Sequence, residues 1–337
     1  MLDLRNLRGL ILLRSNLARS RVRTGGPQTR TPGRVVLGVL MSLCFSDLAQ
    51  SKDNKDISDG DDDSAKSAST LPNIYLDLRT NYTTVPANSL SLGFSPGSLA
   101  SILPALQALS TLTNPPALPA RPTLSTPSSR ILGVDVPLTV DVNDRMSVYG
   151  GFSAATTQTG STDWSTFAVT SWNVGFQADL YQQNGGSIPT LTLQATVTRA
   201  VTDSPLATTS LNTIAEFDYA LNKDETRGLL AGVQLVLTEI DAASATVNPS
   251  IIGYVGGYYQ WDNNWKLTGR VGVQSFGGAQ LPILTPFPSF TQPTVRLDLD
   301  RMDDNDNRLF GVTAQIAWVP KPAYQLTIRT PLYAVRN

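Results

Sequence analysis

Residues 171–200, SWNVGFQADLYQQNGGSIPTLTLQATVTRA, contain two segments in which apolar and polar side chains alternate position by position. In the first segment Trp172, Val174 and Phe176 share one face, and polar or small residues occupy the other. This period of two predicts two β-strands, each with one apolar face, joined at the Gly-Gly turn. A soluble sheet would bury that apolar face, whereas a membrane barrel would turn it toward lipid. The surroundings of the sheet therefore decide the fold.

The same alternation recurs along most of the chain. It is found in residues 131–142, 146–154, 213–221, 229–237, 249–261, 265–277, 293–300, 308–319 and 323–334. With residues 73 to about 94 as one long or broken strand, the pattern predicts roughly twelve strands, an even number as single-chain outer-membrane barrels have. Most are long enough to cross a bilayer at a tilt. No stretch approaches the roughly eighteen apolar residues of a spanning helix.

The connections alternate in length. Short turns are predicted at 143–145, 184–188, 222–226, 262–264 and about 301–307, and longer loops at 95–130, 158–167, 202–211, 239–248 and 278–290. The Pro-Lys-Pro connection at 320–322 is shorter than this alternation predicts. Short turns at one rim and long loops at the other are typical of outer-membrane barrels, and the pattern places both termini at the periplasmic rim.

The polar faces are predicted to point inward. A barrel of about twelve strands is too wide for the many Val, Ala and Gly residues of the apolar faces to fill. The predicted fold is therefore all-β, a transmembrane antiparallel up-and-down β-barrel of about twelve strands. Four tryptophans near strand ends on the apolar face, Trp172, Trp261, Trp265 and Trp318, are predicted to lie at the membrane interface. The alternative is that they pack at the hairpin ends of a soluble sheet.

The N-terminal part differs from the rest. Residues 1–49 carry eight arginines before the apolar run VVLGVLMSLCF at 35–45, the order of a secretory signal, although a buried apolar segment or an organellar transit peptide is an alternative. Residues 50–71 are acidic and polar and are predicted to form a disordered linker. The barrel is assigned to 72–337. Its proline-rich segment at 95–130 is predicted either to narrow the mouth or to form an external loop.

Charged residues on the polar faces are the candidates for lining the lumen. The acidic ones come from the earlier strands and the basic ones from the later strands: Asp135, Asp141, Asp179, Glu216 and Asp218, then Lys266, Arg270, Arg296 and Arg329. Such segregation predicts an acidic wall facing a basic wall, which orients dipolar solutes. Arg79, Arg199 and Asp298 break the segregation. The alternative is therefore a set of neutralising pairs that brace the interior.

The composition argues against catalysis. The chain has no histidine and one cysteine, so the usual general base and metal ligand is missing, and no catalytic residue, metal site or cofactor is predicted. Outer-membrane lipid hydrolases typically need a serine activated by histidine. A formal net charge of -1 gives no basic face for nucleic acid.

Over residues 73–334 the sequence resembles Gram-negative outer-membrane β-barrel proteins, and its hairpins are similar to those of the outer-membrane channel family associated with meta-pathway phenol degradation. The resemblance implies a place in the outer membrane, contact with its lipid, assembly by the barrel-assembly machinery and passage of small solutes. One departure is the ending LYAVRN, which lacks the final aromatic residue that this machinery reads. The predicted function is a channel for small solutes. The alternatives are a non-conducting structural or adhesive barrel and, less favoured, a lipid-modifying enzyme; the solute and the oligomeric state stay open.

Overall fold

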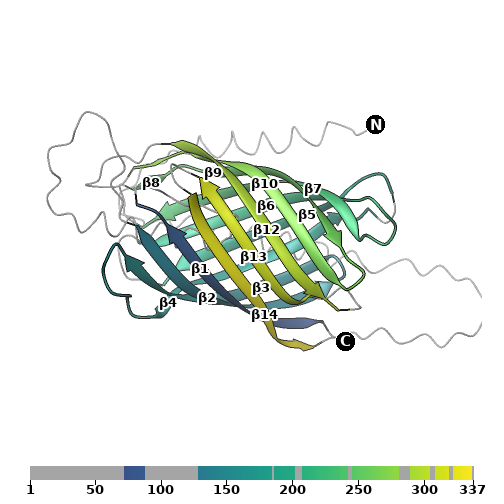
Figure 1. Cartoon of the computed structure of the whole chain (residues 1–337), viewed down its shortest axis with the longest axis horizontal. Coiled ribbons are helices and arrows are strands. Elements are labelled where there is room, and N and C mark those ends of the chain that lie inside the picture. Colours follow the sequence, from purple (N-terminus) through teal and green to yellow (C-terminus); the bar gives the residue numbers. More distant parts are fainter. Residues whose placement is uncertain are drawn as a thin grey trace, which may run out of the picture. The chain divides into compact units, whose positions relative to one another are not determined.

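The computed structural model describes residues 72–87, 128–183, 186–201, 207–241, 245–280, 289–303, 308–318 and 322–335. The predicted signal and linker at 1–71, and most of the proline-rich segment at 95–130, lie outside these ranges. Figure 1 shows the described part as a ring of tilted strands that run side by side. Among these residues none forms a helix of the length and apolar character that a membrane crossing requires.

Twelve strands form a closed antiparallel barrel, and two further short strands form a separate sheet. The strands are β1 (Ile74–Val85), β2 (Ser129–Asn143), β3 (Met146–Thr159), β4 (Ala168–Tyr181), β5 (Thr190–Ala200), β6 (Thr208–Ala220), β7 (Arg227–Ile240), β8 (Thr246–Val247), β9 (Ser250–Gln260), β10 (Trp265–Phe276), β11 (Ala279–Gln280), β12 (Phe290–Met302), β13 (Arg308–Trp318) and β14 (Pro322–Val335). Successive barrel strands pair with one another, and β1 pairs with β14 to close the ring. The predicted up-and-down barrel is confirmed.

Several strands extend further than the alternation indicated. β3 continues to Thr159 and β6 begins at Thr208, although these ends are polar on both faces. Backbone pairing persists there, for example between Ser129 and Thr159, because the hydrogen-bond ladder does not depend on side-chain polarity. β1, in contrast, ends at Val85, and residues 88–94 of the predicted long or broken strand lie outside the described ranges.

The apolar faces point outward. Leu229, Val255 and Val271 are 55%, 59% and 53% exposed, whereas the polar Gln292 and Thr294 are fully buried at 0%. This arrangement is the reverse of a soluble protein, in which exposed contiguous apolar surface is rare. Because a closed barrel satisfies its backbone hydrogen bonds internally, it tolerates lipid around that surface.

The strand bounds agree only in part with the predicted alternation of the two rims, since the β4–β5 connection at 182–189 is as long as the β3–β4 connection at 160–167 on the opposite rim. Residues 144–145 and 261–264 make tight turns at the rim where β1 begins and β14 ends, here called the short-turn rim. The turn at 261–264 includes Asn264 with a positive φ of 62°, a conformation that asparagine tolerates well. Longer connections, and the small β8–β11 sheet, belong to the opposite, long-loop rim.

An ion pair ties a connection to the barrel at the long-loop rim. Arg199, near the end of β5, donates hydrogen bonds of 2.8 and 2.6 Å to Asp241, which follows β7. These hydrogen bonds hold the pKa of the Asp241 carboxyl below its ordinary value. The carboxylate therefore stays charged, and the tie intact, at neutral and mildly acidic pH.

Candidate functional site: the polar lumen

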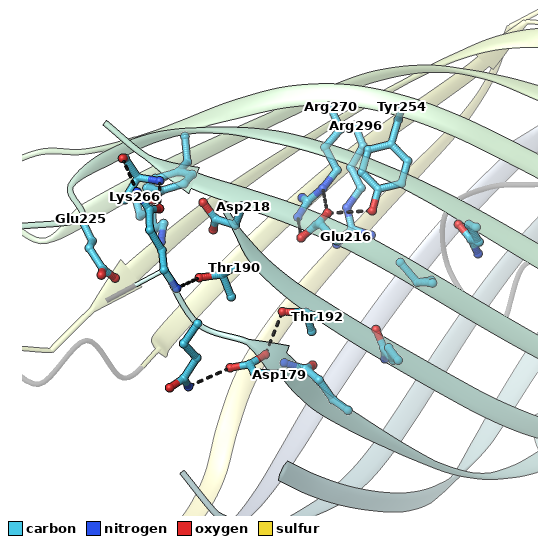
Figure 2. Close-up of a pocket in the computed structure, with 18 of the residues that line it drawn as sticks. Asp179, Thr190, Thr192, Glu216, Asp218, Glu225, Tyr254, Lys266, Arg270 and Arg296 are labelled. Atoms are coloured by element: carbon cyan, nitrogen blue, oxygen red, sulfur yellow. Dashed lines mark hydrogen bonds and ion pairs between the residues drawn. The ribbon is translucent and has the colours of Figure 1, made fainter. Parts of the chain in front are cut away.

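Two polar cavities lie inside the part of the barrel that the structure describes. The first, about 700 Å³, reaches the short-turn rim, since it is lined by Thr190 at the start of β5, Ala220 at the end of β6 and Glu225 in the following turn. Figure 2 shows its labelled charged residues projecting into the barrel from several strands. The second cavity, about 490 Å³, is lined by Thr83 near the end of β1 and Ile131 near the start of β2, so it reaches the long-loop rim.

Buried amide side chains of β6, β7, β10 and β12 fill the interior toward the long-loop rim. Gln234 of β7 donates to Asn212 of β6 at 2.8 Å, and Gln292 of β12 donates to Gln274 of β10 at 2.6 Å. All four side chains belong to residues that are at most 2% exposed. Buried polar groups need such partners. The second cavity therefore reaches the long-loop rim beside β1–β5 and not beside β6–β12.

The two cavities share six lining residues, which we call the waist. One side of the waist is uncharged and the other consists of arginines: Gln177 (β4), Gln194 (β5) and Ile214 (β6), and Arg270 (β10), Arg296 (β12) and Arg308 (β13). A solute that passes from one cavity to the other must pass these side chains.

Carboxylates hold the arginines of the waist in place. Arg270 donates from Nε to Glu216 Oε2 at 3.1 Å and from Nη1 to Asp298 Oδ2 at 2.9 Å. Arg296 binds Asp298 with an Nη2–Oδ1 distance of 2.8 Å, and Arg308 pairs with Asp300 at 2.8 Å. Charge-assisted and forked guanidinium contacts of this kind fix geometry as well as charge.

Tyr254 and a glycine position Glu216. In the barrel wall Glu216 of β6 lies opposite Gly232 of β7, which lies opposite Tyr254 of β9. The phenol of Tyr254 crosses the space that a side chain at Gly232 would occupy and donates to Glu216 at 2.7 Å. Glu216 thus accepts hydrogen bonds from Tyr254 and Arg270, as Figure 2 shows.

The same arrangement recurs twice. Tyr258 lies over Gly228 and hydrogen bonds to Asp218, and Tyr149 lies over Gly175 and reaches Thr196 at 2.6 Å. In each case a glycine in one strand lets a tyrosine from the next strand lie flat against the wall. The lumen keeps its width where an upright tyrosine would narrow it.

Polar groups with spare hydrogen-bonding capacity line the first cavity beyond the waist. Asp179 accepts from Thr192 at 2.8 Å, and Lys266 Nζ lies 4.3 Å from the centre of the Tyr258 ring. Asp218 accepts from Tyr258 with one oxygen, while its Oδ1 has no hydrogen-bond partner among the described residues. The Asp179 carboxylate and the Lys266 ammonium can bind water or a polar solute, whereas the Asp218 Oδ1 atom is buried.

The structure places eight of the nine residues predicted to line the lumen at the cavities. They are Asp135, Asp179, Glu216, Asp218, Lys266, Arg270, Arg296 and Arg329. Asp141 lines neither cavity and accepts from Ser147 Oγ at 2.7 Å, near the β2–β3 turn. The structure brings Glu216, Arg270 and Arg296 together through Asp298, whereas Asp135 accepts separately from Asn81 at 3.0 Å.

Sequence reasoning missed three residues of the waist network. Arg308 and Asp300 lie at the ends of the predicted strands 308–319 and 293–300, and Asp300 has the same inward parity as Arg296 and Asp298. Tyr254 was missed because it lies in a run of mostly apolar and small residues, IIGYVGGYY. Its parity relative to the exposed Val255 was the available signal.

Both predicted charge arrangements have a counterpart in the structure. The charged residues of β2, β4 and β6 that line the cavities are all acidic, and those of β1, β10, β13 and β14 are all basic. Arg270 and Glu216 nevertheless pair across the two groups, and Arg329 pairs with Asp77 across the closing β1–β14 seam. The lumen therefore combines a transverse separation of charge with bracing ion pairs.

The four predicted interface tryptophans are distributed between the two rims. Trp261 and Trp265 flank the β9–β10 turn at the short-turn rim, Trp318 ends β13 at the long-loop rim, and Trp172 is the fifth residue of β4 from that rim. Trp172, Trp261 and Trp318 are 39–45% exposed. These positions fit two aromatic girdles, which is how we interpret them.

No group of three or more Asp, Glu or Cys side chains is placed to hold a metal ion within the part of the chain that the structure describes. Arg270 and Arg296 of the waist pair with the carboxylates Glu216 and Asp298, which lie on either side of it. The arrangement suits binding and passage of water and polar solutes.

Comparisons with known proteins found similarity only at the level of structure. No protein-family model matches the chain, and no curated protein matches it. Similar solved structures include an outer membrane channel from Pseudomonas putida F1, with a TM-score of 0.45 and 12% identity, covering 81% of this chain and 100% of that one. Another is the translocator domain of the autotransporter NalP from Neisseria meningitidis, with a TM-score of 0.41 and 9% identity, covering 93% and 100%.

Because these likenesses are distant, the assignment depends on the barrel itself. An even number of antiparallel strands, a closed ring, an apolar exterior, a polar interior and short turns at one rim are together the architecture of outer-membrane barrels. By this architecture the protein is a twelve-stranded outer-membrane β-barrel.

Proposed function

We propose that the protein is an outer-membrane channel that lets small polar solutes pass through its lumen. The observation that carries the proposal is that two polar cavities meet at the waist, one reaching the short-turn rim and the other the long-loop rim. A barrel with only a structural role could fill its interior with packed side chains, as β6–β12 do near the long-loop rim. The remaining polar space favours a route for solutes.

The lumen chemistry supports polar, and in particular dipolar, solutes. Acidic side chains on β4 and β6 and basic side chains on β10 and β12 face the same space, so a solute with separated charges is oriented between them. An apolar solute would have to displace water from these groups without replacing its hydrogen bonds. No catalytic role is proposed, because the chain has no histidine to activate a nucleophile.

Single-channel recording tests this function. The protein is refolded into detergent, shown to be folded by its heat-modifiable mobility on gels, and inserted into a planar bilayer at two salt concentrations. Discrete conductance steps are expected. A folded barrel that never conducts would overturn the channel and support the alternative, a non-conducting structural barrel.

A further inference from the structure

The waist residues differ from the rest of the lumen in their charge. Three arginines belong to the lining of both cavities, yet no carboxylate does: Glu216 lines only the first cavity, and Asp298 and Asp300 line only the second. The carboxylates therefore flank the waist on its two sides.

Arg270 is the centre of this arrangement. Its guanidinium joins Glu216 on β6 to Asp298 on β12. Strands β7, β9 and β10 lie between β6 and β12 in the ring, so the contacts of Arg270 span five consecutive strands of the barrel. All the other ion pairs of the lumen join residues on the same strand or on neighbouring strands among the described residues. Arg270 thus connects strands that are not neighbours across the inside of the barrel.

Burial and bracing make the bridge a fixed feature. The side chains of Arg270 and Asp298 are 18% and 8% exposed, and Tyr254 holds Glu216 from a third direction. A guanidinium that binds two carboxylates is already held in one position. A passing solute therefore does not displace it easily.

We infer that the Glu216–Arg270–Asp298 bridge is the constriction that sets the conductance and the charge preference of the lumen. This inference rests on the proposed channel function. Arg270 supplies positive charge at the waist, and the negative charge of Glu216 partly compensates it. Removal of Arg270 widens the waist and leaves Glu216 without a cationic partner, which favours cations. Neutralisation of Glu216 leaves Arg270 less compensated, which favours anions.

The test compares four proteins in planar bilayers, all checked for heat-modifiable folding: wild type, Arg270→Ala, Glu216→Gln and Arg199→Ala. Arg270→Ala is expected to raise conductance by about twofold or more and to shift the reversal potential toward cations. Glu216→Gln is expected to shift it toward anions. Arg199→Ala is the matched control, because Arg199 makes a comparable ion pair at the rim but lines neither cavity.

The outcomes separate this inference from the function on which it rests. If the wild type conducts and Arg270→Ala behaves as Arg199→Ala does, the constriction is wrong and the channel stands. If the wild type is silent but the variant conducts, the open channel is wrong and the bridge is the barrier. Silence of every folded protein overturns both. Should Arg270→Ala not fold, the double variant Arg270→Ala with Glu216→Gln leaves no carboxylate at position 216 without a cationic partner. It tests the expected rise in conductance, while its reversal potential should stay near that of the wild type because one positive and one negative charge are removed together.

Discussion

At the scale of single residues, a glycine determines how the waist is built. A Cβ atom at Gly232 would overlap the ring of Tyr254, which crosses that space to reach Glu216. We therefore expect Gly232→Val to expel the tyrosine from the wall and break its hydrogen bond to the carboxylate. A hydrogen bond to a charged group contributes about 1.5–3 kcal/mol, so unfolding by urea should occur at lower denaturant concentration.

Gly253 provides the matched control for this substitution. It lies one strand away in β9, and a Cβ there would have no atom within 4 Å. Gly253→Val should leave stability unchanged or raise it slightly, because valine suits a strand better than glycine does. Equal losses in both variants would show that the cost comes from strand glycines in general and not from Tyr254.

Parity in the sequence predicted which charged residues face inward, but not which of them pair. Because side chains alternate strictly between the two faces of a strand, the sequence of a single strand is enough to predict which residues point inward. The contact of Glu216 with Arg270 joins residues 54 positions apart on strands that are not neighbours. Its formation depends on barrel curvature and on the missing side chain at Gly232, neither of which a single strand reveals.

At the scale of elements, the turn after β6 contains a strained residue. Glu225 adopts a positive φ of 51°, which costs a residue with a Cβ about 1–2 kcal/mol relative to glycine. The turn is fixed by Asn222, whose Oδ1 accepts from the Arg227 backbone at 3.1 Å, so the strain cannot relax freely. Glu225→Gly should therefore raise the free energy of unfolding by about 1 kcal/mol, and with it the urea midpoint.

The control for this prediction separates strain from charge. Glu225→Gln removes the carboxylate that lines the first cavity but keeps a Cβ at the positive φ. It should leave the midpoint near that of the wild type. A midpoint raised equally by both variants would attribute the gain to lost charge repulsion at the short-turn rim.

The strands were the part of the fold that the sequence predicted best. Alternation located every barrel strand, because each has one face toward lipid and one toward water along most of its length. It failed at strand ends such as those of β3 and β6, where both faces are polar. It also gave no sign of β8 and β11, whose two residues each are too short for a period to show.

At the scale of the whole molecule, the apolar exterior should respond to charge according to depth in the bilayer. Val271 is 53% exposed at the middle of β10, and Leu237 is 40% exposed near the long-loop end of β7. If both faces meet lipid, Val271→Arg should destabilise folding into vesicles by about 2–4 kcal/mol, and Leu237→Arg by about 0–1 kcal/mol, because an interfacial arginine reaches water. Reversible urea titration in vesicles, followed by tryptophan fluorescence, measures both. Similar costs at the two depths would mean that water or protein, and not a bilayer, covers the outer face.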